Sequence, residues 1–469
     1  MTLRAARRTI IAGFLAVVML FGGLVGAERY ESERPPGLDP TQFSARDDRL
    51  ATDLLEAVND RSFVDLVDVR FMGLPLPPVL GLVPNVDTTV IELDAAGQPL
   101  AAATVLLSAR YRDGLVIPLD QNLGTDAVRW RRWDDGAWNS RAGQGTDDVV
   151  PGRESAPVDF MAPYPASVFK LMVAFGVLRL ADLGRVDLDA PFAYTPAGDP
   201  SPICEGPRTA TVSKFLDEMI TVSSNPSACA MVRLLHDRNA ITELNGTFGA
   251  LGLPTLQLRG TDPQTGGNWT NAITMSSLDT AKLLLLVNGG PGILWRAPNG
   301  EPVTRDVLRP ESRRFFLRTL REQGLNQVLS TTNWCDRPYP AKGIPQTTPV
   351  RWIDPTDGTV RLPEHRYGQD VRPCNDAAEV TFAHKTGLAE TSGGDAGIVR
   401  SLPGKPWRSY IVVIQSNLGS RFVDPARPED APGVDPVEYS EKFSELGRAV
   451  DELVIAHHNP ERGRRPLAD

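Results

Sequence analysis

Ser167 and Lys170 stand three positions apart, and together they could perform covalent chemistry. They open an apolar segment with helical periodicity, so both side chains should lie on one face, one turn apart. A serine hydroxyl is a weak nucleophile until a nearby base removes its proton, and a lysine can be that base when burial and neighbouring charge lower its pKa. Most S-x-x-K strings lie on ordinary helix surface. Here Lys170 interrupts an apolar run, which favours a buried lysine and predicts a nucleophile beside its base.

A second string, Ser223-Ser-Asn225, precedes Pro226 and a segment of small residues. Proline suits the first helical position, so Asn225 could be a purely structural N-cap. In the functional interpretation, Ser223 passes a proton to a leaving nitrogen and the Asn225 amide holds a substrate amide. Residues two apart do not share a helix face, so this interpretation needs a loop just before the helix.

The third string, Lys385-Thr386-Gly387, ends a segment with strand character. A lysine and a hydroxyl can bind a substrate carboxylate there, and glycine lets a substrate lie against the strand edge. The alternative is an ordinary exit from a strand into a turn. Each string alone is a weak signal. Their conjunction, on a helix start, a loop and a strand end, predicts one acyl-transfer site.

In this order the strings form the S-x-x-K, S-x-N and K-T-G set of the penicillin-recognising serine enzymes. The chain resembles class A-like serine β-lactamases and penicillin-binding proteins over roughly residues 46–459, with interruptions. The resemblance implies a β-lactamase/transpeptidase-like fold. It also implies an oxyanion hole made by the backbone N–H groups of Ser167 and Leu388, which would stabilise the transition state.

The chain departs from the class A pattern in the segment that should release the acyl group. In those enzymes a glutamate, followed by proline and then asparagine, positions the hydrolytic water. The corresponding string here is Gly260-Thr-Asp262-Pro-Gln-Thr-Gly266. Asp262 is one methylene shorter than glutamate, and Gly266 replaces the amide. Asp262 is therefore either a catalytic carboxylate or a turn residue before proline.

The remaining pattern predicts an α+β architecture, in which an antiparallel sheet is flanked by terminal helices and accompanied by an all-helical subdomain. Alternating or apolar runs bounded by turn residues predict strands at 88–93, up to 107, 379–385, 397–402 and 407–416. Helical periodicity predicts helices at 47–60, 167–183, 211–220, 226–237, 239–250, 276–288 and 437–458. Residues 108–160 have no clear assignment, and 185–189 look extended. The irregular stretch 331–376 is expected to be an insertion that lids or narrows the cleft.

The amino-terminal segment predicts an extracytoplasmic protein. Residues 1–27 combine early arginines, an apolar run and small residues, which indicates a signal peptide or a membrane anchor, and residues 28–45 read as a linker. The four cysteines then predict two disulfides, of which three pairings are possible. Pairing of sequence neighbours, Cys204 with Cys229 and Cys335 with Cys374, is the expectation. No ligand pattern favours a metal site.

The predicted function is an exported serine hydrolase that acts on β-lactam amide bonds through an acyl-enzyme. One alternative is a penicillin-binding D,D-peptidase, or a slow acyl-enzyme former, acting on peptidoglycan stem peptides. Another is a non-catalytic envelope-binding protein. A net charge of -9 argues against nucleic acid as a partner, and the chemistry requires no cofactor. His384 should point away from Lys385, as neighbours on a strand do.

Overall fold

The structure is a computed structural model, and all described residues lie in one compact unit, Pro35–Asp469. The described residues are 45–67, 76, 79, 81, 83–132, 147–196, 202–270, 272–337, 340–419, 421–423, 434–436 and 440–459. The predicted signal peptide or anchor, and all of the predicted linker except its last residue, lie outside them. No helix in the described ranges is both long enough and apolar enough to span a bilayer.

A six-stranded antiparallel sheet forms the centre of the unit, with the strand order β14-β15-β16-β1-β2-β3. The strands are β1 (Val86–Leu93), β2 (Pro99–Leu107), β3 (Leu115–Ile117), β14 (Val380–Ala389), β15 (Ser392–Ser401) and β16 (Ser409–Ser416). Every residue of β1 and β16 is buried, because helices cover both faces of the sheet.

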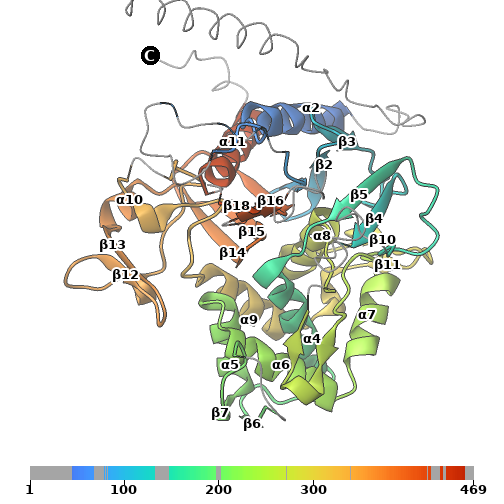
Figure 1. Cartoon of the computed structure of the whole chain (residues 1–469), viewed down its shortest axis with the longest axis vertical. Helices are drawn as coiled ribbons and strands as arrows, with labels where there is room; N and C mark the ends of the chain where they lie inside the picture. Colours follow the sequence, from blue (N-terminus) through green and yellow to red (C-terminus); the bar gives the residue numbers. More distant parts are fainter. Residues whose placement is uncertain are drawn as a thin grey trace, which may run out of the picture. The chain divides into compact units, whose positions relative to one another are not determined.

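Side chains of one strand alternate between two hydrophobic cores. Val412 and Ile414 of β16 pack with α2 (Ala45–Asp60) and α11 (Ser440–His458). Ile411 and Val413 belong to the larger core on the opposite face, which includes α8 (Ser277–Asn288). Figure 1 shows α2 and α11 along one side of the sheet, with most other helices on the far side. The predicted terminal helices thus cover a single face.

The helical subdomain surrounds α4 (Lys170–Asp182), which is buried along nearly its whole length. Its neighbours are α5 (Val212–Thr221), α6 (Asn225–Asp237), α7 (Ile241–Ala250) and α9 (Pro310–Arg321). Sequence patterns predicted all of these except α9. The predicted α+β architecture, with its sheet, terminal helices and helical subdomain, is confirmed.

Shorter elements join these parts. They are β4 (Val128–Arg132), β5 (Val158–Ala162), β6 (Pro191–Tyr194), β7 (Arg208–Thr211), β8 (Thr261–Asp262), β9 (Asn268–Trp269), β10 (Trp295–Arg296), β11 (Pro302–Val303), β17 (Arg421–Val423) and β18 (Val434–Pro436). Short 3-10 helices are η3 (Ala166–Phe169), η4 (Pro263–Thr265), η5 (Arg305–Val307), η6 (Thr332–Trp334) and η7 (Val350–Trp352). Residues 185–189, expected to be extended, form no strand because the chain turns there before β6.

The predicted insertion has structure of its own. It contains the hairpin β12 (Thr359–Arg361)–β13 (Arg366–Asp370) and the helix α10 (Arg372–Ala377), which share a small apolar core. The expected disulfide between Cys335 and Cys374 ties its two ends together, and the expected pair Cys204–Cys229 is also present. Both predicted pairings are confirmed.

Candidate active site

Ser167 and Lys170 lie where a 3-10 helix passes into the central α-helix. Ser167 belongs to η3 and is partly exposed, whereas Lys170 is the first residue of α4 and is fully buried. Ala166, just before the serine, has a φ of 44°, in the left-handed region that alanine rarely adopts. The Trp269 ring packs on Phe169 at a centroid distance of 4.7 Å, so the hairpin β8–β9 braces this helix start.

The Lys170 amine is held by the S-x-N loop. Its Nζ donates to the Ser223 carbonyl oxygen at 2.5 Å, to Ser223 Oγ at 3.1 Å and to Asn225 Oδ1 at 2.7 Å. Burial, followed by the positive charge of Lys385, lowers the pKa of Lys170 well below its ordinary value. Burial and the nearby Lys385 charge therefore favour the neutral amine, which can accept a proton.

Ser224, rather than Asn225, caps helix α6. The Ser224 hydroxyl accepts a hydrogen bond from the Ser227 backbone N–H at 3.2 Å, and Pro226 occupies the first turn. The alternative in which Asn225 is only the N-cap is therefore wrong. Because Ser224 fulfils the capping role, the Asn225 side chain turns toward Lys170. Ser223, at a φ of 59°, is the residue at which the chain changes direction.

Lys385 reaches the same hydroxyl from the sheet. Its Nζ donates to Ser223 Oγ at 3.0 Å and to the Thr386 carbonyl oxygen at 2.7 Å. Burial lowers the pKa of Lys385 to about 7, and the buried Asp395 opposes this shift. Asp395 is the β15 residue paired with Thr386. The structure thus brings together four predicted residues: Lys170, Ser223, Asn225 and Lys385.

Close contact between strand β14 and the helix start places the segment that carries Ser167 beside Gly387. A Cβ atom added to Gly387 would lie 2.6 Å from the Pro165 carbonyl oxygen and 3.0 Å from the Val168 nitrogen, so only glycine fits there. Thr386 is almost fully buried, and Leu388 is half-buried next to Gly387. The segments that carry Ser167 and Leu388 are therefore in contact, as an oxyanion hole built from their N–H groups would need.

A supporting network behind the S-x-N loop did not emerge from the sequence patterns. The Ser227 hydroxyl donates to Glu218 Oε2 at 2.8 Å, and the Ser224 hydroxyl lies 3.1 Å from that of Ser227. Arg208 donates to Glu218 Oε1 at 2.8 Å. These side chains join α5, α6 and β7. No sequence signal reveals them, because the contacts depend on how the two helices pack.

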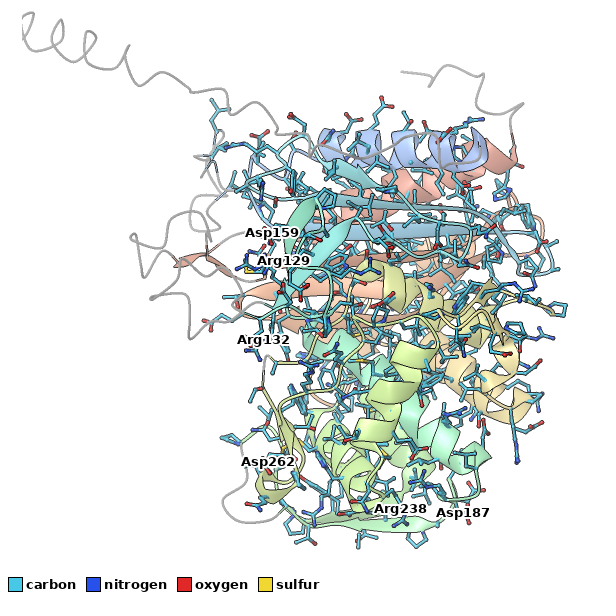
Figure 2. The ribbon with its side chains drawn as sticks, turned by 90° about the vertical axis from the view of Figure 1, so that its right-hand side faces the viewer. Arg129, Arg132, Asp159, Asp187, Arg238 and Asp262 are labelled. Atoms are coloured by element: carbon cyan, nitrogen blue, oxygen red, sulfur yellow. A yellow bond between two sulfur atoms is a disulfide. The ribbon has the colours of Figure 1, made fainter. Side chains whose placement is uncertain are left out.

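The structure does not bring Asp262 to the gathered residues. Asp262 is exposed, and its Oδ1 accepts a hydrogen bond from the Gln264 N–H at 2.8 Å, which caps η4. Among the described residues, no hydrogen bond or ion pair joins it to Ser167 or Lys170. Figure 2 shows Asp262 at the outer edge of the helical subdomain. Asp262 thus makes the contact expected of a turn residue, and its carboxylate does not lie where it could activate a water near Ser167.

His384 contacts a different set of residues from its neighbour Lys385, as strand alternation predicts. It is fully buried, with Nδ1 2.8 Å from Asp395 Oδ1 and Nε2 2.9 Å from Asn326 Oδ1. Its ring stacks on Phe382. These contacts anchor β14 to β15 and to the loop after α9.

Residues 162–345 match the model of a family described as the beta-lactamase enzyme family. The matched stretch contains the S-x-x-K and S-x-N strings, and the resemblance inferred from the motifs is confirmed. The observed arrangement of the sheet, the terminal helices and the helical subdomain is the β-lactamase/transpeptidase-like fold which that resemblance implied.

Similar solved structures cover most of the chain. A structure of PBP-A is 17% identical, covers 86% of this chain and 96% of its own, and has a TM-score of 0.43. A representative class A beta-lactamase from Bacteroides cellulosilyticus DSM 14838 is 13% identical, with 87% and 99% coverage and a TM-score of 0.43. The TLA-3 extended-spectrum beta-lactamase is 14% identical, with 87% and 99% coverage and a TM-score of 0.42. No curated protein matches the chain.

Proposed function

We propose that this protein is a serine acyl-enzyme that opens the amide bond of β-lactams. The observation that carries the proposal is the convergence of two buried lysines on Ser223 Oγ, beside the segment that holds Ser167. A binding protein without turnover has no need to bury two amines around one hydroxyl, because burying such groups is unfavourable.

In the proposed acylation step, Lys170 takes the Ser167 proton and the serine oxygen attacks the lactam carbonyl. The carbonyl becomes an oxyanion, which the N–H groups of Ser167 and Leu388 stabilise. Ser223 gives its proton to the leaving nitrogen as the C–N bond breaks, and a proton from the neighbouring lysines restores its hydroxyl. Lys385 and Thr386 hold the substrate carboxylate, and Asn225 holds its amide.

A second candidate is a penicillin-binding D,D-peptidase, or slow acyl-enzyme former, that acts on peptidoglycan stem peptides. The specific observation in its favour is the position of Asp262, which caps an exposed turn. Without a carboxylate to activate water, hydrolysis of a β-lactam acyl-enzyme is expected to be slow. Acylation at Ser167 is common to both candidates, whereas the rate of release distinguishes them.

One experiment tests both candidates. The purified protein is mixed with a chromogenic cephalosporin, and colour and intact mass are followed together, with Ser167→Ala as the control. Rapid colour without an adduct supports a β-lactamase. An adduct that persists on Ser167 supports the penicillin-binding candidate. Absence of both colour and adduct would overturn the proposal.

We also infer that the protein acts outside the cytoplasm. Two disulfides fit an oxidising compartment, and residues 1–27 have the composition of a signal peptide or an anchor. Both candidate substrates, β-lactams and peptidoglycan stem peptides, occur there. Protease treatment of intact cells that express the protein tests this inference, since a cytoplasmic protein would be protected.

A further inference from the structure

A pocket of about 330 Å³ lies between the S-x-N loop and the insertion. Ser224 and Pro226 line it on the side of the loop. Trp352, Leu362 and Pro363 line it on the side of the insertion. Because the insertion forms one wall, this pocket depends on a part of the chain outside the three motifs.

The pocket is next to the candidate active site. Its lining residues Ser224 and Pro226 flank Asn225, whose Oδ1 contacts Lys170, and Ser224 directly follows Ser223. Glu364, also in the lining, is close enough for its charge to raise the pKa of Lys170, against the stronger effect of burial. A group attached to a substrate at Ser167 could therefore extend into the pocket.

The cations in the pocket wall already have acidic partners. Arg208 and Lys214 both form ion pairs with Glu218. Arg351 forms a bidentate pair with Asp217, at 3.0 Å for each contact, and lies 3.7 Å from Glu322. Taken together, the three carboxylates Asp217, Glu218 and Glu322 balance the three cations, so the wall offers little net positive charge to a ligand.

Glu364 differs from these groups. It lies in the tight turn between β12 and β13, which is closed by a hydrogen bond from the Leu362 N–H to the His365 carbonyl oxygen at 2.8 Å. The side chain is exposed and, among the described residues, forms no ion pair. The bidentate pair of Arg351 with Asp217 ties the insertion to α5, and the disulfide Cys335–Cys374 ties the two ends of the insertion together, so the Glu364 turn has a fixed support.

We propose that this pocket is a subsite for an aliphatic substrate group that ends in a primary ammonium, with Glu364 as its specificity-determining residue. The apolar side chains of Trp352, Leu362 and Pro226 would contact the aliphatic portion, and the Glu364 carboxylate would pair with the ammonium. The proposal rests on the acyl-enzyme function above, because the group must belong to a molecule that reacts at Ser167.

The test uses two penicillins with the same flexible acyl chain, which ends in a primary amine in one and in its N-acetyl derivative in the other. Acylation of Ser167 by each is followed by intact mass. We expect the wild-type protein to react about 1.5-fold to fivefold faster with the amine, the range for an exposed ion pair. Glu364→Gln, which keeps size and polarity, should bring the ratio of the two rates close to one.

Glu301→Gln is the matched control, because it removes one exposed carboxylate from the turn between β10 and β11, outside the pocket. It should retain the wild-type ratio. Equal rates in the wild type, or a preference that survives in Glu364→Gln, would overturn the subsite while leaving acylation intact. Failure of both penicillins to acylate the wild type would overturn the proposed function and the subsite together.

Discussion

Lys170 and Lys385 donate hydrogen bonds to one oxygen atom, Ser223 Oγ, at 3.1 and 3.0 Å. One amine comes from the start of α4 and the other from strand β14, and both are buried. Two ammonium groups this close together repel each other, so their proximity favours the neutral form of at least one. The arrangement suits Lys170 as the base and Lys385 as the cation that binds a carboxylate.

Replacement of Lys170 by alanine should reduce the acylation rate about 100-fold or more, since a positioned base typically contributes that much. The rate is measured as the appearance of a benzylpenicillin adduct by intact mass. Lys405→Ala, in the exposed turn between β15 and β16, is the control and should be labelled at the wild-type rate. Labelling of the folded Lys170→Ala protein at that same rate would exclude Lys170 as the base.

Gly387→Ala should both destabilise the protein and impair acylation. The added Cβ would lie 2.6 Å from the Pro165 carbonyl oxygen and 2.8 Å from Val168 Cγ2, so β14 must move away from the nucleophile. We expect a loss of about 1 to 3 kcal/mol in the free energy of unfolding, measured with urea. Gly206→Ala is the matched control, because no atom lies within 4 Å of its added Cβ. Equal stability of the two variants would contradict the described packing.

The binding of the substrate carboxylate should weaken as the pH rises through neutrality. The pKa of Lys385 is lowered to about 7, so the amine is mostly protonated below that pH and mostly neutral above it. The measurement is the ratio of acylation rates for a penicillin and its methyl ester, which cancels the titration of Lys170. This ratio should fall between about pH 6 and about pH 8.5, within which the penicillin carboxylate stays ionised. A constant ratio would show that Lys385 does not bind the carboxylate.

Asp262→Asn provides a direct choice between the two interpretations of Asp262. If Asp262 were a catalytic carboxylate, its replacement would make the adduct longer-lived. The exposed capping position predicts instead that the adduct lifetime stays within about twofold, as expected for a surface change. Asparagine can still accept the hydrogen bond from the Gln264 N–H, so the turn should persist. A lifetime many times longer would restore the catalytic interpretation.

Local patterns were sufficient to predict most elements of the fold. The apolar stripe of α2, the hairpin β1–β2 and the strands β14 to β16 follow from periodicities of 3.6 and 2 residues. Helix α9 was missed because five of its twelve residues are arginine or glutamate, which hides its narrow apolar face. The pairing of β1 with β16 also had no local signal, because it joins distant parts of the chain.

The candidate site was predictable where a motif names the residue and unpredictable where packing decides. Motif spacing was enough to identify Lys170, Ser223, Asn225 and Lys385. That Ser224 caps α6 while Asn225 contacts Lys170 could be seen only from the geometry of the helix start. Glu364 belongs to no motif. Its position in the pocket could not be predicted, because it depends on how the insertion folds onto α5.

The pairing of β1 with β16 also bears on how the protein is made. Asn85 and Asn417, at one end of this strand pair, are hydrogen-bonded although they are 332 positions apart. A ribosome must therefore synthesise nearly the whole polypeptide before the middle of the sheet can close. Until then β1 lacks its neighbour β16, and the unpaired edge of β1 is open to wrong association. Because such long-range pairing forms slowly, we expect the newly made chain to depend on a chaperone until the sheet has closed.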